Sequence, residues 1–221
     1  MLDRLWQLLL GRYCVLCREA VKADAGRRQL CRWCLASLPW RPDPEQHAEI
    51  PGITRSFAPF AYAGVVRQWV LDAKHDAGLV SARMLGVLLA ESLQDAYPFP
   101  AERPELLIPV PLTNRRLRAR GHNQAVLIAV QVSRILGVPL KRSCARRIRE
   151  TEILAGFGPK ERRAQVARGF AASSLPPGSR VAIIDDVVTT GATATALASA
   201  LKRAGAAEVH LWASSMAPHP T

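Results

Sequence analysis

The sequence predicts an α/β protein with a central, mostly parallel sheet, preceded by a small ribbon built on four cysteines. Strand-like and helix-like segments alternate from residue 106 onward, and residues 181–184 are a wholly apolar run of Val, Ala, Ile and Ile. Both features are typical of a parallel sheet whose strands are covered by helices on two faces. Two Cys-x-x-Cys pairs near the amino terminus predict the ribbon. We expect the ribbon segment to occupy residues 1–50 and the α/β domain to occupy residues 51–221.

The individual elements are expected from residue type and from the placement of glycine and proline. Aromatic residues favour a strand near the start of the domain, and Gly137 followed by Pro139 ends a helix. The expected strands lie at 55–63, 106–111, 140–147, 168–172, 181–184 and 209–215, and the expected helices at 66–73, 82–93, 123–136 and 192–204. Cys144 is expected in the core. Residues 148–166 lack periodicity, and a loop this long in a compact domain is commonly a lid.

The composition is that of a packed domain with a strong positive charge. The 221 residues are 49% hydrophobic and carry a formal net charge of +12, which favours polyanionic partners such as nucleic acid, nucleotides or phosphorylated metabolites. Residues 1–10 lack the apolar core of a signal peptide, and no run approaches the roughly 20 apolar residues of a membrane span. We therefore expect a cytoplasmic protein without a membrane span.

The four cysteines of the ribbon are candidate zinc ligands. They are Cys14, Cys17, Cys31 and Cys34, with thirteen residues between the two pairs. Four thiolates at this spacing can hold zinc in a tetrahedral site without an open position, which would make the site structural. The alternatives are free cysteines or a redox pair, although a redox Cys-x-x-Cys normally occurs once. Basic residues surround the pairs, so the ribbon could also contact nucleic acid.

The most informative stretch is VAIIDDVVTTGAT at residues 181–193. Asp185 and Asp186 are expected where the apolar strand ends. Five residues then lead into the next helix: Thr189, Thr190, Gly191, Ala192 and Thr193. A helix N-terminus offers backbone N–H groups and the positive end of its dipole to a phosphate, and glycine allows a close approach. The carboxylates can bind a sugar diol, or a magnesium ion with its waters, so the stretch predicts a site for a phosphorylated sugar.

The same stretch has other interpretations. Threonine and glycine can simply cap a helix, with the aspartates solvated at a strand end. A Walker B strand also ends in acidic residues, but no Gly-x-x-x-x-Gly-Lys-Ser/Thr loop occurs in the chain. The Gly-x-Gly-x-x-Gly fingerprint of a dinucleotide-binding fold is absent as well.

Two basic segments are candidates for contacts with further phosphates. Arg115, Arg116 and Arg120 follow the strand expected at 106–111, at the sheet edge where open α/β sheets bind ligands. Lys74 lies beside a histidine and shortly before a glycine, where the pair could bind a pyrophosphate or a base. The alternatives are a basic surface loop for the arginines and a solvated helix end for Lys74, where cations are favoured in any case.

Three features in this order resemble the ComF/GntX family: the four-cysteine ribbon, the segment RRLRARGHNQ at 115–124, and the loop DDVVTTGAT at 185–193. The last of these closely resembles the phosphoribosyl-pyrophosphate (PRPP) loop of type I phosphoribosyltransferases. The resemblance implies the type I phosphoribosyltransferase fold for the α/β domain. It implies that Asp185 and Asp186 hold the ribose hydroxyls, directly or through magnesium, and that residues 189–193 hold the 5′-phosphate. It also implies a role in competence or DNA uptake, with single-stranded DNA or DNA-uptake proteins as partners.

The resemblance further implies a pyrophosphate loop at 109–116 and a flexible hood at 148–165. Thr151 and Arg163 are candidate contacts of the hood, and Lys74 matches a Lys-Tyr/His pair of the family. The family patterns Thr-x-x-Gln and Arg-x-Asn are changed here, because Leu154 and Gln165 stand at their last positions. The polar contacts of the hood are therefore expected to differ from those of the family.

Two functions from different classes are consistent with these residues. The first is a protein that binds PRPP or a nucleotide, with magnesium, and acts in DNA uptake. The second is an active phosphoribosyltransferase in nucleobase salvage, although no residue stands out as its catalytic base. The changed hood and the net charge of +12 favour the first function.

Overall fold

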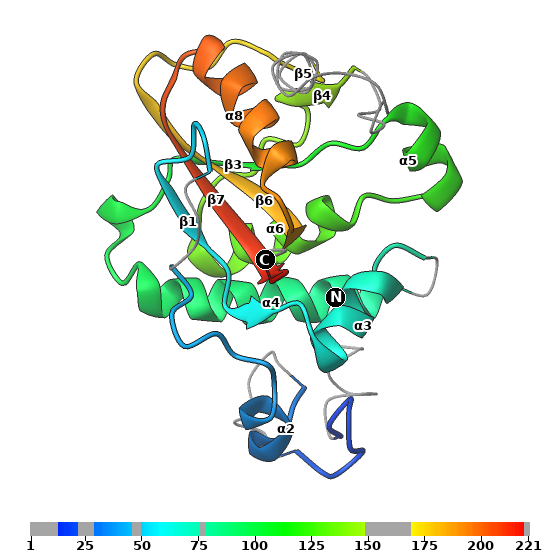
Figure 1. Ribbon diagram of the computed structural model, residues 1–221. Coiled ribbons are helices and arrows are strands. Elements are labelled where there is room, and N and C mark those ends of the chain that lie inside the picture. The colour runs from blue at the N-terminus through cyan, green and yellow to red at the C-terminus, as the bar shows by residue number, and fades with distance from the viewer. Residues whose placement is uncertain (1–12, 22–28, 46–49, 76–77, 149–168, 219–221) are drawn as a thin grey trace.

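A parallel sheet lies at the centre of the protein, as the computed structural model shows for residues 13–21, 29–45, 50–75, 78–148 and 169–218 (Figure 1). Its strand order is β1-β7-β6-β3, and β2 pairs with β7 as well. The strands are β1 (Arg55–Phe57), β2 (Phe60–Ala61), β3 (Leu106–Pro109), β6 (Ser179–Val188) and β7 (Ala206–Met216). All their pairings are parallel, so the predicted parallel α/β sheet is confirmed.

The apolar run predicted from the sequence forms the middle of β6. Its four residues, Val181 to Ile184, are completely buried. Val181 and Ile183 face the hydrophobic cluster around helix α8 (Ala192–Arg203), whereas Ala182 and Ile184 belong to the cluster on the opposite face. Because successive strand residues point to opposite faces, a wholly apolar strand requires a covering layer on both sides.

Three helices cover the face opposite α8: α3 (Gly64–Asp72), α4 (Leu79–Ala96) and α6 (Gln124–Leu136) (Figure 1). Helices α4 and α6 approach closely at Gly86, where a β-carbon would lie 2.8 Å from the carbonyl oxygen of Ile128. The absence of a side chain at Gly86 therefore sets the distance between these two helices. Among the described helices, none has both the length and the apolar character needed to cross a membrane.

One prediction was wrong, because residues 140–147 do not form a core strand. Leu140 makes a single bridge to Leu107, and the chain then turns through the exposed polar residues 141–143. Charged side chains are rarely tolerated in the centre of a sheet, so the chain leaves it here. Strand β4 (Ala145–Arg147) pairs antiparallel with β5 (Phe170–Ala172) in a separate small sheet. Cys144 is buried, as predicted.

The other predicted elements are present with shifted ends. Pro59 lies between β1 and β2 and divides the strand expected at 55–63, since proline cannot donate a ladder hydrogen bond. The remaining short elements are α2 (Arg32–Ala36), η3 (Pro100–Glu102) and α5 (Asn114–Arg120). Helix α5 occupies the arginine-rich segment that the sequence suggested as a loop.

The ribbon segment packs beneath the helical layer that contains α3 (Figure 1). Cys14 and Leu38 belong to the same hydrophobic cluster as Trp69 of α3. At the junction, the centroid of the Trp40 ring lies 4.5 Å from that of Phe60 in β2. The described part of the ribbon and the helical layer therefore share one core.

Candidate functional site

The acidic pair lies where β6 continues beyond one of its neighbours. Pairing with β3 ends at Ile184, whose carbonyl accepts a hydrogen bond from the Val110 amide at 3.0 Å. Pairing with β7 continues as far as Val188. The sequence predicted that Asp185 and Asp186 lie where the strand ends. In the structure they lie within β6, just beyond its last residue pair with β3. The physical reason is that β7 extends to Met216 and keeps β6 in a ladder.

Asp186 is fixed from several directions. Its side chain is 5% exposed, and its amide donates a hydrogen bond of 2.9 Å to Oδ1 of Asp185. Its carbonyl accepts a hydrogen bond of 3.2 Å from the Ser215 hydroxyl of β7. Oδ2 of Asp186 lies 3.3 Å from Nζ of Lys74, in an ion pair whose geometry is not that of a hydrogen bond. The carboxylate is thus held by charge rather than by a saturated hydrogen-bond network.

Burial and the adjacent carboxylate of Asp186 make Asp185 costly to ionise. Burial raises the pKa of Asp185 well above that of an ordinary aspartate, and the neighbouring Asp186 carboxylate raises it further. Lys74 acts in the opposite direction, but one ammonium cannot neutralise two carboxylates. Such a pair suits a hard cation such as Mg²⁺, which prefers oxygen ligands, or the hydroxyl donors of a sugar diol.

A turn with two exposed hydroxyls leads from β6 into α8. Thr189 and Thr190 are exposed, and Gly191 occupies the N-cap position of α8 with φ of +72°. The backbone conformation of Gly191 favours glycine, and a β-carbon there would lie in tight contact with the side chain of Ile50, at 3.1 Å. Gly191 has no side chain to cap the helix, and the Ala192 amide is 3.4 Å from the Thr190 hydroxyl. The first turn of α8 therefore offers the amide donors and dipole that suit a phosphate.

The arginine-rich segment forms a helix rather than a loop. Helix α5 begins at the N-cap Thr113, whose hydroxyl accepts a hydrogen bond from the Arg116 amide, and ends at Gly121. Arg115 and Arg116 are exposed, and Arg120 donates a hydrogen bond of 3.4 Å to the side chain of Gln124.

The residues that follow α5 tie neighbouring segments together. Nε2 of His122 donates a hydrogen bond of 2.8 Å to the carbonyl of Ala73, directly before Lys74. The side chain of Asn123 donates to the Val110 carbonyl at 3.0 Å and accepts from the Ala125 amide at 2.9 Å, which caps α6. The sequence did not assign these roles. Asparagine directly before an apolar helical run is a local signal for the cap of α6. The contacts with Ala73 and Val110 have no such signal, because they join residues 49 and 13 positions apart.

Lys74 is brought to the acidic pair rather than to α5. It lies in the turn after α3, where its amide donates to the Leu71 carbonyl at 3.0 Å. The other predicted contacts of the hood, Thr151 and Arg163, lie outside the described residues, as do the changed positions Leu154 and Gln165.

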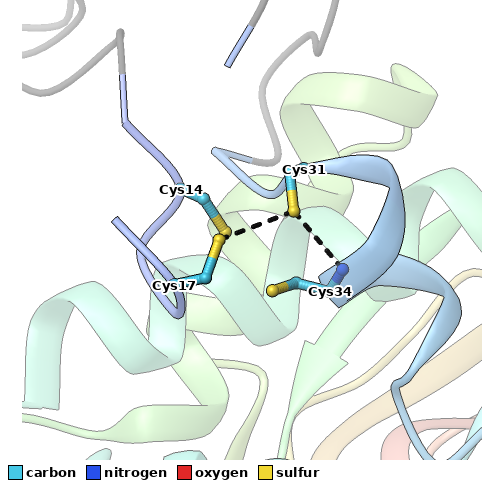
Figure 2. Close-up of side chains that lie close together, drawn as sticks. All are labelled: Cys14, Cys17, Cys31 and Cys34. Atoms are coloured by element: carbon cyan, nitrogen blue, oxygen red, sulfur yellow. Dashed lines mark hydrogen bonds between the residues drawn. The ribbon is translucent and has the colours of Figure 1, made fainter. Parts of the chain in front are cut away.

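The four ribbon cysteines converge on one point (Figure 2). Their sulfur atoms all lie within 4.8 Å of one another, and the Sγ atoms of Cys17 and Cys31 are 3.7 Å apart. Four sulfurs at about 2.3 Å from a tetrahedral zinc ion would be separated by about 3.8 Å, whereas a disulfide needs about 2.05 Å. All four are free thiols, and the amide of Cys34 lies 3.4 Å from Sγ of Cys31. The cluster can therefore hold a metal such as zinc.

The pKa values of the cluster differ strongly between its members. Burial raises the pKa of Cys14, but hydrogen bonds from the backbone of Cys17 and its neighbours outweigh this effect and lower the pKa to about 6. Burial, together with hydrogen bonds to the other thiols, raises the pKa of Cys34 to about 12. A cation is therefore needed if all four are to be thiolates at neutral pH.

Comparison with known proteins agrees with this arrangement. A phosphoribosyl transferase domain matches residues 122–220, which contain the acidic pair, the threonine turn and α8. The chain is 35% identical over 134 residues to competence protein F of Haemophilus influenzae, and 31% identical over 133 residues to the DNA utilization protein YhgH of Salmonella typhimurium. Over the aligned residues, this chain is similar to both proteins. The predicted family resemblance is confirmed, and the domain match with the parallel sheet confirms the type I phosphoribosyltransferase fold.

The homology covers only part of each protein. The two alignments span 59% and 60% of this chain, and 58% and 59% of the respective relatives, which is less than two thirds of their length. Among solved structures, the purine phosphoribosyltransferase of Pyrococcus horikoshii matches with 22% identity and a TM-score of 0.36, over 63% of this chain and 82% of that one. The allosteric regulatory enzyme of purine biosynthesis matches with 20% identity and a TM-score of 0.41, over 60% of this chain and 26% of that one.

Replacing Asp185 with asparagine is expected to stabilise the protein near neutral pH. Because the pKa of Asp185 is raised in the folded protein, ionisation favours the unfolded chain at every pH above the ordinary aspartate pKa. Asparagine keeps an oxygen for the Asp186 amide and removes the charge. We expect the Tm at pH 7 to rise by roughly 2–4 °C in thermal unfolding.

The gain should disappear below about pH 4, where the carboxyl is protonated in both states. Asp95→Asn, on the exposed surface of α4, is the matched control and should leave the Tm unchanged. A lower Tm for Asp185→Asn than for the natural protein at pH 7 would contradict the repulsion between the two carboxylates.

Proposed function

We propose that this protein binds PRPP together with magnesium and acts in DNA uptake. The observation that carries the proposal is that two adjacent carboxylates in β6, one of them costly to ionise, lie just before the glycine-capped N-terminus of α8. The phosphate of a sugar phosphate suits the amide donors of α8 and the hydroxyls of Thr189, Thr190 and Thr193. Asp185 and Asp186, on the adjoining strand, suit the two ribose hydroxyls or a magnesium ion.

The pyrophosphate of the ligand needs cationic partners, and several are proposed. Arg115, Arg116 and Arg120 belong to α5, which follows β3 at the carboxyl edge of the sheet. Thr151 and Arg163 of the hood are proposed to close over the bound ligand and to exclude water. Arginine suits these contacts because its planar guanidinium can hold two phosphate oxygens at once.

The ribbon metal is proposed to be structural zinc. Four cysteines fill a tetrahedral coordination sphere, so no position is left for a substrate. The ribbon is too small to bury a core of its own, and metal binding would supply the free energy that orders it. The five cysteines are all free thiols, which is consistent with the reducing cytoplasm as the proposed location.

The printed names of the relatives, competence protein F and DNA utilization protein, support a setting in DNA uptake. The ribbon offers a surface suited to single-stranded DNA. Trp33 is 71% exposed, and the guanidinium carbon of Arg32 lies 4.6 Å from the centre of its ring. Exposed aromatic rings beside basic residues stack with bases and hold the backbone of single strands. We propose single-stranded DNA as a partner, and DNA-uptake proteins as further partners.

The alternative is an active phosphoribosyltransferase in nucleobase salvage. Such an enzyme would break the bond between C1′ of the ribose and the pyrophosphate through a cationic sugar, while arginines stabilise the departing charge. The acidic pair of β6 and the first turn of α8 would bind the PRPP in this reaction too. The two functions differ in whether a base accepts the ribose phosphate.

Titration calorimetry with PRPP and Mg²⁺ is expected to detect binding to the full chain. Gly191→Ala should weaken this binding by at least about tenfold, because alanine rarely adopts the φ of +72° that the turn before α8 requires, and its β-carbon would also press on the side chain of Ile50. Gly137→Ala is the matched control: Gly137 has the same φ of +72°, but it lies at the end of α6, and a β-carbon there meets nothing within 4 Å.

Absence of PRPP binding to the natural protein would exclude both the binding function and the transferase. If PRPP binds, Mg²⁺-dependent release of pyrophosphate in the presence of a panel of bases separates the two. The proposed function predicts binding without turnover for every base of the panel.

The purified protein is expected to contain about one zinc ion per chain by elemental analysis. Cys14→Ser should lose most of it, whereas Cys144→Ala, which removes a buried thiol outside the cluster, should keep it. A natural protein that is folded and free of metal would refute the structural zinc site.

Trp33→Ala is expected to weaken binding of a single-stranded oligonucleotide by roughly fivefold or more, since stacking of one base on an aromatic ring contributes about 1–3 kcal/mol. Fluorescence anisotropy at several salt concentrations would measure both the affinity and its electrostatic part. Phe99→Ala is the control, because Phe99 is 65% exposed but lies outside the ribbon. Equal affinities for the two variants would exclude Trp33 as a stacking residue.

A further inference from the structure

Lys74 is the cation that the described structure places against the acidic pair. Its Nζ lies 3.3 Å from Oδ2 of Asp186, whose side chain is only 5% exposed. A carboxylate this deeply buried requires a positive partner, because an unpaired buried charge is strongly unfavourable. Lys74 therefore supplies the positive charge that Asp186 requires, and a divalent cation bound to the same carboxylate would supply it as well.

The backbone around Lys74 holds it in this place. Helix α3 ends at Asp72, and the following turn is closed by hydrogen bonds from the Lys74 amide to Leu71 and from the His75 amide to Asp72. The carbonyl directly before Lys74, that of Ala73, accepts the 2.8 Å hydrogen bond from His122. The lysine is thus anchored at its backbone by a segment that belongs to the loop after α5.

The side chain of Lys74, in contrast, keeps freedom to move. It is 25% exposed, and its ammonium is a point charge on a flexible four-carbon chain. Another anion close to the site can therefore attract the ammonium away from Asp186 without any change in the backbone. The pyrophosphate of PRPP would be such an anion, placed next to the acidic pair.

We infer that Lys74 is a tethered cation that competes with the divalent cation for Asp186, so that the metal binds firmly only when the polyphosphate of the sugar ligand accompanies it. This role rests on the proposed function for the identity of the ligand. Without PRPP, Lys74 neutralises Asp186 and weakens the attraction of the acidic pair for a free metal ion. With PRPP, the ammonium transfers to the phosphates and the carboxylates become available. Lys74 is then a positioning residue that orders ligand and metal binding.

Binding of Mn²⁺ alone, measured from the electron paramagnetic resonance signal of the free ion, tests this inference without any turnover. Lys74→Met is expected to bind Mn²⁺ at least about tenfold more tightly than the natural protein, because a positive charge a few ångströms from the carboxylate is removed. Lys202→Met is the matched control. It removes the same charge from the exposed last turn of α8, about ten residues or 15 Å along the helix from the site, and should leave the Mn²⁺ affinity unchanged.

A Mn²⁺ affinity of Lys74→Met equal to or lower than that of the natural protein would overturn the inference. Should Lys74→Met fail to fold, the double variant Lys74→Met/Asp186→Asn removes both charges, and the single variant Lys74→Arg keeps a cation. A double variant that folds where Lys74→Met does not would confirm that Lys74 and Asp186 form one charge pair. Lys74→Arg tests the competition directly, because it should bind Mn²⁺ as weakly as the natural protein, and tight binding would overturn the inference.

The proposed function can fail separately. If PRPP does not bind but Lys74→Met still gains affinity for Mn²⁺, the competition stands and the identity of the ligand is wrong. If PRPP binds and the Mn²⁺ affinity does not respond to Lys74→Met, the ligand stands and the competition is wrong.

Discussion

Strand β6 remains hydrogen-bonded to β7 as far as Val188 but to β3 only as far as Ile184, and the candidate site depends on this difference. Two neighbouring carboxylates inside a fully paired sheet could not be solvated or reached. Because β3 leaves the ladder first, Asp185 and Asp186 lie beyond the last residue pair with β3, while β7 still fixes their backbone. Pairing with β7 therefore keeps this part of β6 rigid, and the end of the pairing with β3 leaves its other edge available for a ligand.

Helix α3 joins the two chemically distinct parts of the molecule. Trp69 of this helix lies in the hydrophobic cluster that also contains Cys14 of the ribbon, and the turn after the helix carries Lys74 to Asp186. His122, in the loop after α5, donates a hydrogen bond to the Ala73 carbonyl of that turn. The four-cysteine cluster and the acidic pair are therefore built on one continuous helical layer, so the packing of the ribbon contributes to the placement of a charged group in the site.

The site contains features that oppose the stability of the fold. Burial makes Asp185 costly to ionise, and Asp186 is a buried carboxylate that pairs with Lys74. Gly191 adopts a backbone conformation that other residues rarely occupy. Local rules of stability are commonly broken at functional sites, where the surrounding structure holds the strained groups in place. The fully buried residues of β6 on the preceding positions, together with the helices on both faces, provide that support here.

The sequence alone determined the fold class, the strand at 181–184, the four-cysteine cluster and the turn of Thr189 to Gly191 before α8, because these depend on local composition and spacing. An apolar run must be buried, and Cys-x-x-Cys pairs keep their sulfurs close whatever the rest of the chain does. It erred at 140–147, where the exposed polar residues 141–143 turn the chain away from the sheet after the single bridge of Leu140 to Leu107. Only the tertiary structure decided that Lys74 pairs with Asp186, that His122 holds Ala73, and that Ile50 packs on Gly191. Each of these contacts joins residues 49 or more positions apart, and such pairings follow from how the layers stack rather than from any local pattern.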